Sequence, residues 1–236
     1  MRKLRFFPVA LSLLSAVGGI SPAADRFQAS LNFLMGYPQN EFRRNIDRTF
    51  YGLSGEFFFH FPRSPLAVGI SLEYLNYGSE RRVEPLSPDI PDVLVDVTTR
   101  NSLFSTAAVF RLSPVEGAIR PYIEALVGFN YLFTYTSVSD DGDWSEDIAT
   151  TTNFDDWSLT YGAGAGAVIR ALDIRSQGGR SLFSLHMEAG VRYCRGRAAE
   201  YLRQGAIRRD HGSLWYEPVI SDTDLLKTHL GLVFRF

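Results

Sequence analysis

The residues that most closely match a catalytic set lie near position 186. Ser184, His186 and Glu188 alternate with apolar residues along one short segment. A serine near a histidine and an acid can perform nucleophilic catalysis. If the segment is a strand, however, side chains on one face repeat about 6.6–6.8 Å apart, too far for a proton relay unless the side chains bend. We therefore interpret the three as the polar face of a strand, not as a triad.

Two further polar clusters lie in segments without periodicity. Asp210, His211 and Ser213 form a second candidate catalytic set, although three polar residues in a loop are more often simply part of that loop. An acidic cluster comprises Asp140, Asp141, Asp143, Glu146 and Asp147. Its carboxylates suit calcium, but the EF-hand spacing is absent, so a solvated acidic loop is favoured. We expect no catalytic residue, no metal site and no cofactor.

Elements that could position such residues are indicated by a two-residue alternation of apolar with small or polar side chains. Successive side chains on a strand point to opposite faces, so this alternation predicts β-strands. Eight segments of about 10–14 residues show it, the fourth least regularly: 27–36, 51–61, 66–75, 101–112, 123–133, 157–170, 183–193 and 226–236. Strands that cross a membrane need about 9–11 residues, whereas strands of soluble proteins average about 5–6. Eight is also an even number, as closure of an antiparallel bacterial barrel requires.

The connections between the eight segments alternate in length. Residues 62–65, 113–120 and 171–180 are short to medium connections. The long connections are 38–50, 79–100, 134–156 and 195–223. Short turns on one rim and long loops on the other are typical of a membrane-spanning up-and-down barrel. A soluble lipocalin-like barrel is the main alternative, but it fits poorly with outer faces that lack charge on all eight segments.

The first residues have the order of a secretory signal peptide. A basic start precedes an apolar or small run over 6–20, and small residues follow up to Ala24. That run is short for a helix that spans a bilayer, although an uncleaved anchor is the alternative. Cleavage after Ala24 would change the net charge from −2 to −5, because Arg2, Lys3 and Arg5 would be removed. The lone Cys194 cannot form an internal disulfide, and no basic excess favours nucleic-acid binding.

The closing segment resembles the terminal targeting strand of outer-membrane barrels. Leu230, Leu232, Phe234 and the final Phe236 match that family's alternating apolar residues and C-terminal aromatic. The glycine alternation over 161–167, and residues 121–128 before it, also resemble strands of the family. The similar group comprises outer-membrane protein A, outer-membrane protein X and the opacity adhesins. The resemblance implies an assembly signal at these four residues, read by the barrel-assembly machinery.

The inward faces of the expected barrel carry many charged or titratable side chains. An outward Arg or Lys at the bilayer midplane would cost about 2–4 kcal/mol, and the outward sets contain none. An eight-stranded barrel is just wide enough for side chains to fill, so inward charges must pair. We predict a lumenal charge network of Glu56, Glu73, Glu124, Glu188, Arg192, Lys227 and His229. Arg170, Arg235, His60 and His186 also face inward, with the two arginines best suited to a wet rim.

Aromatic residues near segment ends are candidates for interfacial girdles, with simple β-propensity as the alternative. They are Tyr37, Tyr51, Tyr74, Tyr122, Trp157, Tyr193 and Phe236. The last long connection is basic, through Arg195, Arg197, Arg203, Arg208 and Arg209. Outward arginines can bind lipopolysaccharide phosphates in bidentate fashion, or they can pair with the acidic loop.

We therefore expect an all-β protein, an eight-stranded antiparallel transmembrane up-and-down β-barrel over residues 25–236 after a signal peptide at 1–24. Its expected location is the bacterial outer membrane. Its expected role is structural or interactive, in adhesion or membrane integrity through long surface loops, without catalysis. Expected partners are outer-membrane lipids, lipopolysaccharide, the assembly machinery and host or surface ligands. A lipid A-modifying enzyme and a narrow, porin-like pore remain the alternatives.

Overall fold

The computed structural model describes residues 26–87, 90–140, 147–175, 181–210 and 213–236. The expected signal peptide at 1–24 therefore lies outside the described residues. Eight strands form a closed barrel: β1 (Phe27–Pro38), β2 (Phe50–His60), β3 (Leu66–Ser87), β4 (Ile90–Leu112), β5 (Ile119–Asp140), β6 (Asp147–Arg175), β7 (Ser181–Gly196) and β10 (Leu225–Arg235). A helix, α2 (Asn40–Asn45), and a separate hairpin, β8 (Ala198–Asp210) and β9 (Ser213–Asp222), complete the fold.

Every strand of the barrel is antiparallel to both neighbours, in the order β1-β10-β7-β6-β5-β4-β3-β2. The barrel closes where β1 pairs with β10, and Phe27 and Phe236 exchange two backbone hydrogen bonds of 3.1 Å. A closed sheet has no free edge, so every backbone group can be paired within the wall. The predicted eight-stranded antiparallel barrel is confirmed.

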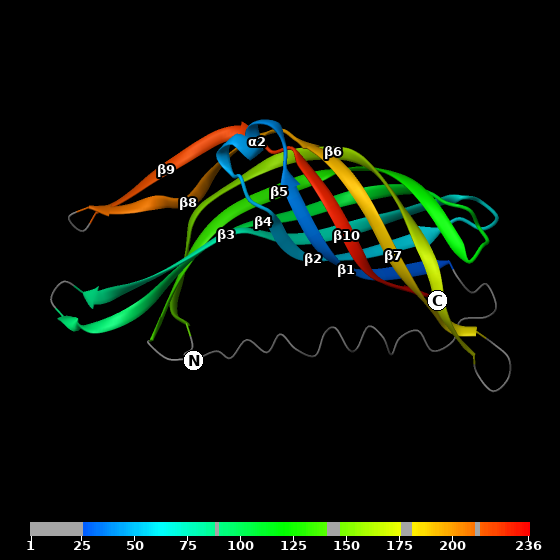
Figure 1. The fold of residues 1–236 in the computed structure, drawn as a ribbon, viewed down its shortest axis with the longest axis horizontal. Helices are drawn as coiled ribbons and strands as arrows, with labels where there is room; N and C mark the ends of the chain where they lie inside the picture. Colours follow the sequence, from blue (N-terminus) through cyan, green and yellow to red (C-terminus); the bar gives the residue numbers. More distant parts are fainter. Residues whose placement is uncertain (1–25, 88–89, 141–146, 176–180, 211–212) are drawn as a thin grey trace.

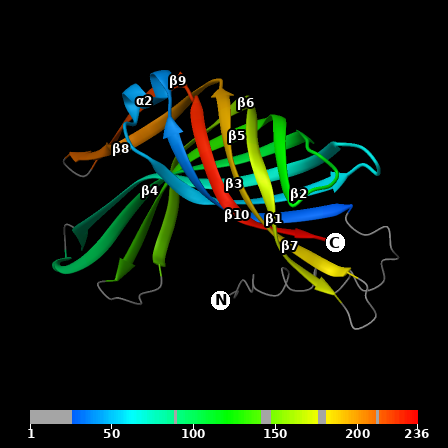
Figure 2. The ribbon, with the colours of Figure 1, turned by 45° about the vertical axis from the view of Figure 1, so that its right-hand side comes forward.

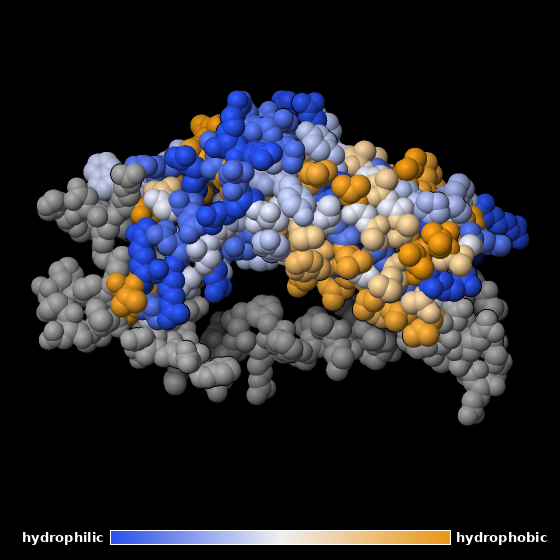
Figure 3. Space-filling model, viewed as in Figure 1, coloured by the Kyte–Doolittle hydropathy of each residue, from blue (hydrophilic) through white to orange (hydrophobic). Residues whose placement is uncertain are grey.

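Side-chain alternation divides the wall into two chemically different faces. In β1, Leu31 and Phe33 are 60% and 47% exposed, whereas Asn32 and Leu34, which alternate with them, are 1% and 0% exposed. Each of the other barrel strands likewise exposes large apolar side chains to the outside, for example Leu53, Ile70, Phe110, Ile123, Leu159, Val191 and Leu232. Figure 3 shows apolar side chains gathered over the barrel wall, and hydrophilic ones over α2 and the base of the hairpins.

The two rims of the barrel differ in their connections. We call the end with the β2–β3 and β4–β5 turns, at 61–65 and 113–118, the turn rim. We call the opposite end, which carries α2 and the β8–β9 hairpin, the loop rim. The β3–β4 and β8–β9 hairpins extend beyond the barrel on the same side in both ribbon views (Figures 1 and 2).

Most of the connections that we expected to be long loops are instead strand. The pairs β3–β4 and β5–β6 continue well beyond the barrel, and most of the segment 195–223 forms the β8–β9 hairpin. Strand also continues through 171–175, and α2 lies within 38–50. These extensions contain Thr and Val, which favour strands, but no regular apolar alternation marks them.

An apolar core fills the barrel at the loop rim. Phe42 of α2 packs edge-on against Phe50 of β2 and Tyr201 of β8, with ring centroids 5.5 and 5.2 Å apart. The other members of this loop-rim core are Leu34, Ile46, Leu75, Tyr77, Leu103, Leu132, Ala199 and Leu225. Burial of Phe42 therefore holds α2 across the barrel mouth. No helix among the described residues is long and apolar enough to cross a membrane.

Candidate functional site

The centre of the barrel holds a cluster of buried ion pairs around Arg192 of β7. Its guanidinium lies 2.5 Å from a carboxylate oxygen of Glu124, 2.6 Å from one of Glu56 and 3.1 Å from one of Glu73. These carboxylates come from β5, β2 and β3, so Arg192 links strands across the lumen. A planar guanidinium carries five donors, which suits it to several acceptors at once.

A second arginine, Arg111 of β4, completes the cluster toward the turn rim. It lies 2.9 Å from oxygens of Glu124 and Glu188, and 3.3 Å from one of Glu56. Its guanidinium carbon also lies 4.2 Å from the ring centroid of Phe58 and 4.0 Å from that of Tyr122. Arg111 was not among the lumenal residues predicted from the sequence. Strand alternation could have identified it, because Arg111 directly follows the outward-facing Phe110 and must therefore point into the barrel.

The remaining members of the predicted network lie at its margins. Lys227 of β10 contacts the second oxygen of Glu73 in a buried ion pair. His229 Nε2 lies 2.9 Å from the Tyr122 hydroxyl and 3.7 Å from an oxygen of Glu188. All seven predicted lumenal residues are thus buried in one connected cluster, which we call the lumenal network, with Arg111 and Tyr122 added.

Tyr122 corrects one sequence-based expectation. We placed it among interfacial aromatic residues because it lies near a strand end, but its side chain is buried inside the barrel. Because successive side chains of a strand alternate, Tyr122 points inward next to the outward-facing Ile123. The aromatic residues Tyr51, Tyr74, Trp157 and Tyr193 do face outward near the loop rim, and Phe236 stacks on Phe27 near the turn rim, with centroids 6.4 Å apart.

The Ser184, His186 and Glu188 set is divided by the structure. His186 Nε2 lies 2.8 Å from Ser184 Oγ, so the imidazole bridges the spacing that we expected to separate them. Glu188 instead pairs with Arg111, while Arg120, which the sequence analysis did not single out, contacts the other side of His186 at 3.2 Å. No carboxylate of the trio is therefore available to orient the imidazole.

Other inward residues gather near the turn rim. His60 Nε2 and the Arg235 guanidinium each lie 3.1 Å from the side-chain oxygen of Gln28. Arg235 is buried, contrary to the wet-rim position that we expected, whereas Arg170 is exposed. Cys194 is a buried thiol in a small apolar cluster with Phe58 and Leu126.

The predicted assembly-signal residues lie along the barrel seam. Leu230, Leu232 and Phe234 face outward from β10, and Phe236 makes the last backbone pair with β1. Within the described residues, no group of three or more His, Cys, Asp or Glu is arranged to hold a metal ion.

The five predicted surface arginines take different positions. Arg195 and Arg197 are exposed on the outward face of β7 and just beyond its end, above Tyr193. Arg203 lines a pocket at the loop rim. The side chains of Arg208 and Arg209 lie outside the described residues, as do those of the Asp210, His211 and Ser213 set and of the acidic cluster at 140–147.

No family model and no curated protein sequence matches the chain. Among solved structures, Neisserial surface protein A matches with a TM-score of 0.44 and 12% identity over 90% of this chain and 97% of that chain.

Two further solved structures are similar. A major outer membrane protein of Thermus thermophilus has a TM-score of 0.43 and 13% identity, over 89% of this chain and 99% of that one. Ail, the attachment invasion locus protein of Yersinia pestis, solved with the heparin analogue sucrose octasulfate, has a TM-score of 0.38 and 14% identity over the same shares.

Proposed function

We propose that residues 25–236 form an integral outer-membrane barrel that serves as a structural and interaction scaffold, and that its loop-rim elements act in adhesion or membrane integrity. The observation that carries the proposal is the outer wall. All eight barrel strands expose large apolar side chains. On β1, the outward positions from Phe27 to Tyr37 carry no charged residue, and the same holds at this level of the other strands. Apolar surface of this extent needs lipid or a partner to cover it.

The interior supports a scaffold better than a pore. Arg111 and Arg192 are both less than 2% exposed and are surrounded by carboxylates, while the loop-rim core closes the mouth above them. A water-filled channel would hydrate such charges. Planar-bilayer recordings of the purified protein should show no conductance steps, and reproducible steps would support the alternative of a narrow pore.

The enzyme alternative has one geometric element in its favour, the contact between Ser184 and His186. Both side chains are buried, and Glu188 is engaged by Arg111. We infer that the pair is structural. Mass spectrometry of lipid A from cells with and without this protein should show the same species, and a modified species that requires the protein would overturn this inference.

Lipopolysaccharide contact is supported by the position of Arg195 and Arg197. Both are exposed, and neither makes an ion pair with a described residue. Arg195 pairs in register with Tyr161 of β6 and follows the outward Tyr193 on its own strand, so it lies at the level of exposed aromatic residues near the loop rim. Arginine at that level can bind lipid phosphate through two hydrogen bonds. Changing both to Gln should weaken salt-sensitive lipopolysaccharide binding, whereas the change Arg43→Gln, on the exposed side of α2, should not.

The test of the whole proposal is made with the intact protein. A closed barrel in detergent should migrate differently on a gel before and after boiling, and the protein should fractionate with the outer membrane. Protease added to whole cells should cut the β8–β9 hairpin. Identical migration of boiled and unboiled samples would count against a closed barrel, and recovery in the cytosolic fraction would refute the location.

Assembly offers a separate test of the terminal signal. Phe236 both closes the seam and ends the predicted recognition segment. Deletion of Phe236 should reduce the folded fraction in the outer membrane of cells. Refolding of the same variant into lipid vesicles without any machinery should be affected less, because only one backbone pair and one ring contact are lost. Equal losses in both settings would argue against a role in recognition.

A further inference from the structure

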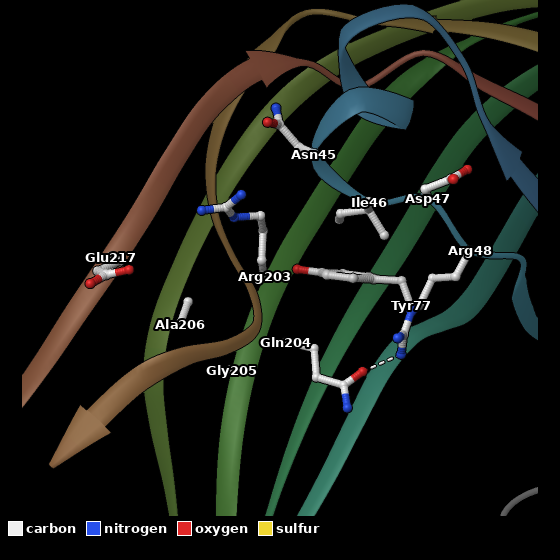
Figure 4. A pocket seen from close by; sticks show the side chains of 10 residues that line it. All are labelled: Asn45, Ile46, Asp47, Arg48, Tyr77, Arg203, Gln204, Gly205, Ala206 and Glu217. Atoms are coloured by element: carbon white, nitrogen blue, oxygen red, sulfur yellow. Dashed lines mark hydrogen bonds between the residues drawn. The ribbon is translucent and has the colours of Figure 1, made fainter.

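A polar recess lies at the loop rim, outside the lumenal network. It has a volume of about 390 Å³ and is open to solvent on one side. Figure 4 shows that its lining side chains come from three parts of the fold: the end of α2 and the segment after it, strand β3, and the β8–β9 hairpin. Pockets that bind small molecules have volumes of about 300–1,000 Å³, so this one could hold a small ligand.

The pocket is formed by a break in the pairing of β8 with β9. Their register shifts between Leu202 and Ile207, and Gly205 within the shift has a φ of +77°, a conformation that other residues rarely adopt. The bulge moves β8 away from its partner and opens the space. Gln204 holds the bulge in place, because it hydrogen-bonds to Arg48 (Figure 4) and donates to the carbonyl of Ser79 at 3.1 Å.

The floor of the pocket is tied to the loop-rim core. Tyr77 is buried beneath it, and its hydroxyl lies 3.5 Å from the carbonyl of Leu202. Asn45 donates to the Tyr201 hydroxyl at 3.1 Å. A pocket whose walls are held by a packed core is largely formed before a ligand arrives, which lowers the entropic cost of binding.

Planar polar groups of both charges line the opening. The lining holds Arg48 and Arg203 beside Asp47 and Glu217, so these four charges balance, and Asp47 also lies 3.4 Å from Arg43 of α2. Arg203 makes no ion pair with any described residue. Carboxylate, amide and guanidinium groups offer paired acceptors and donors at fixed angles, which suits vicinal hydroxyl groups. A strongly anionic ligand would meet both carboxylates, so charge balance favours a neutral one.

An exposed aromatic side chain stands beside this opening. Trp215 is 64% exposed on β9, two residues before Glu217, and alternation puts both on the same face of the strand. The Cα atoms of Trp215 and Glu217 are therefore about 6.6–6.8 Å apart along the strand. A large exposed indole offers a flat apolar surface next to a polar pocket. Sugar rings have that pairing of properties, with hydroxyl groups at the edge and C–H groups on the face.

We propose that this pocket binds a neutral saccharide, with Arg203 and the carboxylates on the hydroxyl groups and Trp215 against the ring face. The proposal rests on the proposed function, because it requires the loop rim to face the outside of the cell. It assigns that rim a ligand class and a site. Surface glycans of another cell and sugars of the bacterium's own envelope share this chemistry, and the experiment separates them.

The first measurement uses saturation-transfer NMR on the full barrel, purified in a detergent without a sugar headgroup. Sucrose and sucrose octasulfate serve as neutral and polyanionic probes with one skeleton, beside glucose, galactose, mannose and N-acetylglucosamine. We expect transfer to at least one neutral sugar. Arg203→Ala and Trp215→Ala should each weaken it at least tenfold. Tyr216→Ala, which removes the neighbouring aromatic on the opposite face of β9, should leave it unchanged.

The second measurement is a glycan array that carries core oligosaccharides of the bacterium's lipopolysaccharide and glycans of animal cells. Binding to either set, lost in the two variants, supports the proposal and identifies the source. The proposal is overturned by absence of binding to every neutral sugar, by binding of the octasulfate alone, or by equal binding in the variants. The heat-dependent gel shift, measured on each protein, separates these failures from loss of the barrel itself.

Discussion

Replacement of Arg192 by Met tests whether the lumenal network holds the barrel together. Met fills a similar space and has no charge, so the change removes one cation from between three carboxylates. The neighbours are not left alone. Glu73 keeps its contact with Lys227, and Glu56 and Glu124 keep Arg111. Each carboxylate thus loses one of two cationic partners.

The magnitude follows from burial. Removal of one partner of a buried ion pair costs about 3–5 kcal/mol, because the other charge stays desolvated without compensation. The side chains of Arg192, Glu56 and Glu124 are all 0% exposed, so that estimate applies without a reduction for solvent screening. Since all three carboxylates retain a cation, we expect about 3–5 kcal/mol in total and not three times that value.

Urea unfolding of the barrel in lipid vesicles, followed by tryptophan fluorescence, measures the loss. With a denaturant slope of about 1–3 kcal/mol per molar, the midpoint should fall by roughly 1–5 M. Arg195→Met is the matched control, since it lies three residues along the same strand but faces outward without an ion pair among the described residues. A loss below about 1 kcal/mol, or an equal loss in the control, would refute a stabilising network.

Three other perturbations test separate parts of the structure. Glu188→Leu should lower the unfolding free energy by more than about 1 kcal/mol, since it removes a buried counter-charge, and unchanged stability would argue against the network. Gly52→Ala should block folding, because its Cβ would lie 1.7 Å from a backbone oxygen of β3, whereas Gly55→Ala has nothing within 4 Å and should fold normally on the same gel assay. The hydrogen bond from Arg81 lowers the pKa of Asp96, so Arg81→Gln should raise the carboxyl titration midpoint in NMR. That pair contributes stability above the ordinary Asp pKa of about 3.9 and loses it as pH falls through the lowered pKa.

The lumen could be read from the sequence because strand alternation has a strict period of two. Once Leu230 and Leu232 are placed outside, Lys227 and His229 must lie inside, and closure of the barrel brings them to the other strands. Arg111 was not predicted because both faces of 101–112 are largely small or apolar, so the alternation that distinguishes the inward face is weakest in that segment. Tyr122 was wrongly predicted to be an interfacial aromatic residue, because its position near a strand end was given more importance than its place in the alternation.

The loop rim could not be predicted in the same way. The extended hairpins carry polar residues on both faces, so neither the period nor a face marks them as strand. The pocket depends on a bulge at 203–206 and on contacts between α2, β3 and β8, which are distant in the chain. Nothing in local spacing encodes those contacts. The one local sign was Gly205, and an isolated glycine is compatible with many backbone conformations.

The interior has two layers, the lumenal network and the loop-rim core, and each stabilises a different part of the fold. In the lumenal network, charges on opposite strands satisfy one another, and this fixes the barrel from inside without reference to the loops. In the loop-rim core, Phe42 and Tyr201 extend the packed interior past the barrel mouth and hold α2 and β8 in place. The β8 bulge is therefore supported by apolar packing, while its polar side chains stay available to solvent. Substitutions at Arg203 or Trp215 can then alter what the rim binds without cost to the network below, because the two layers share no side chain.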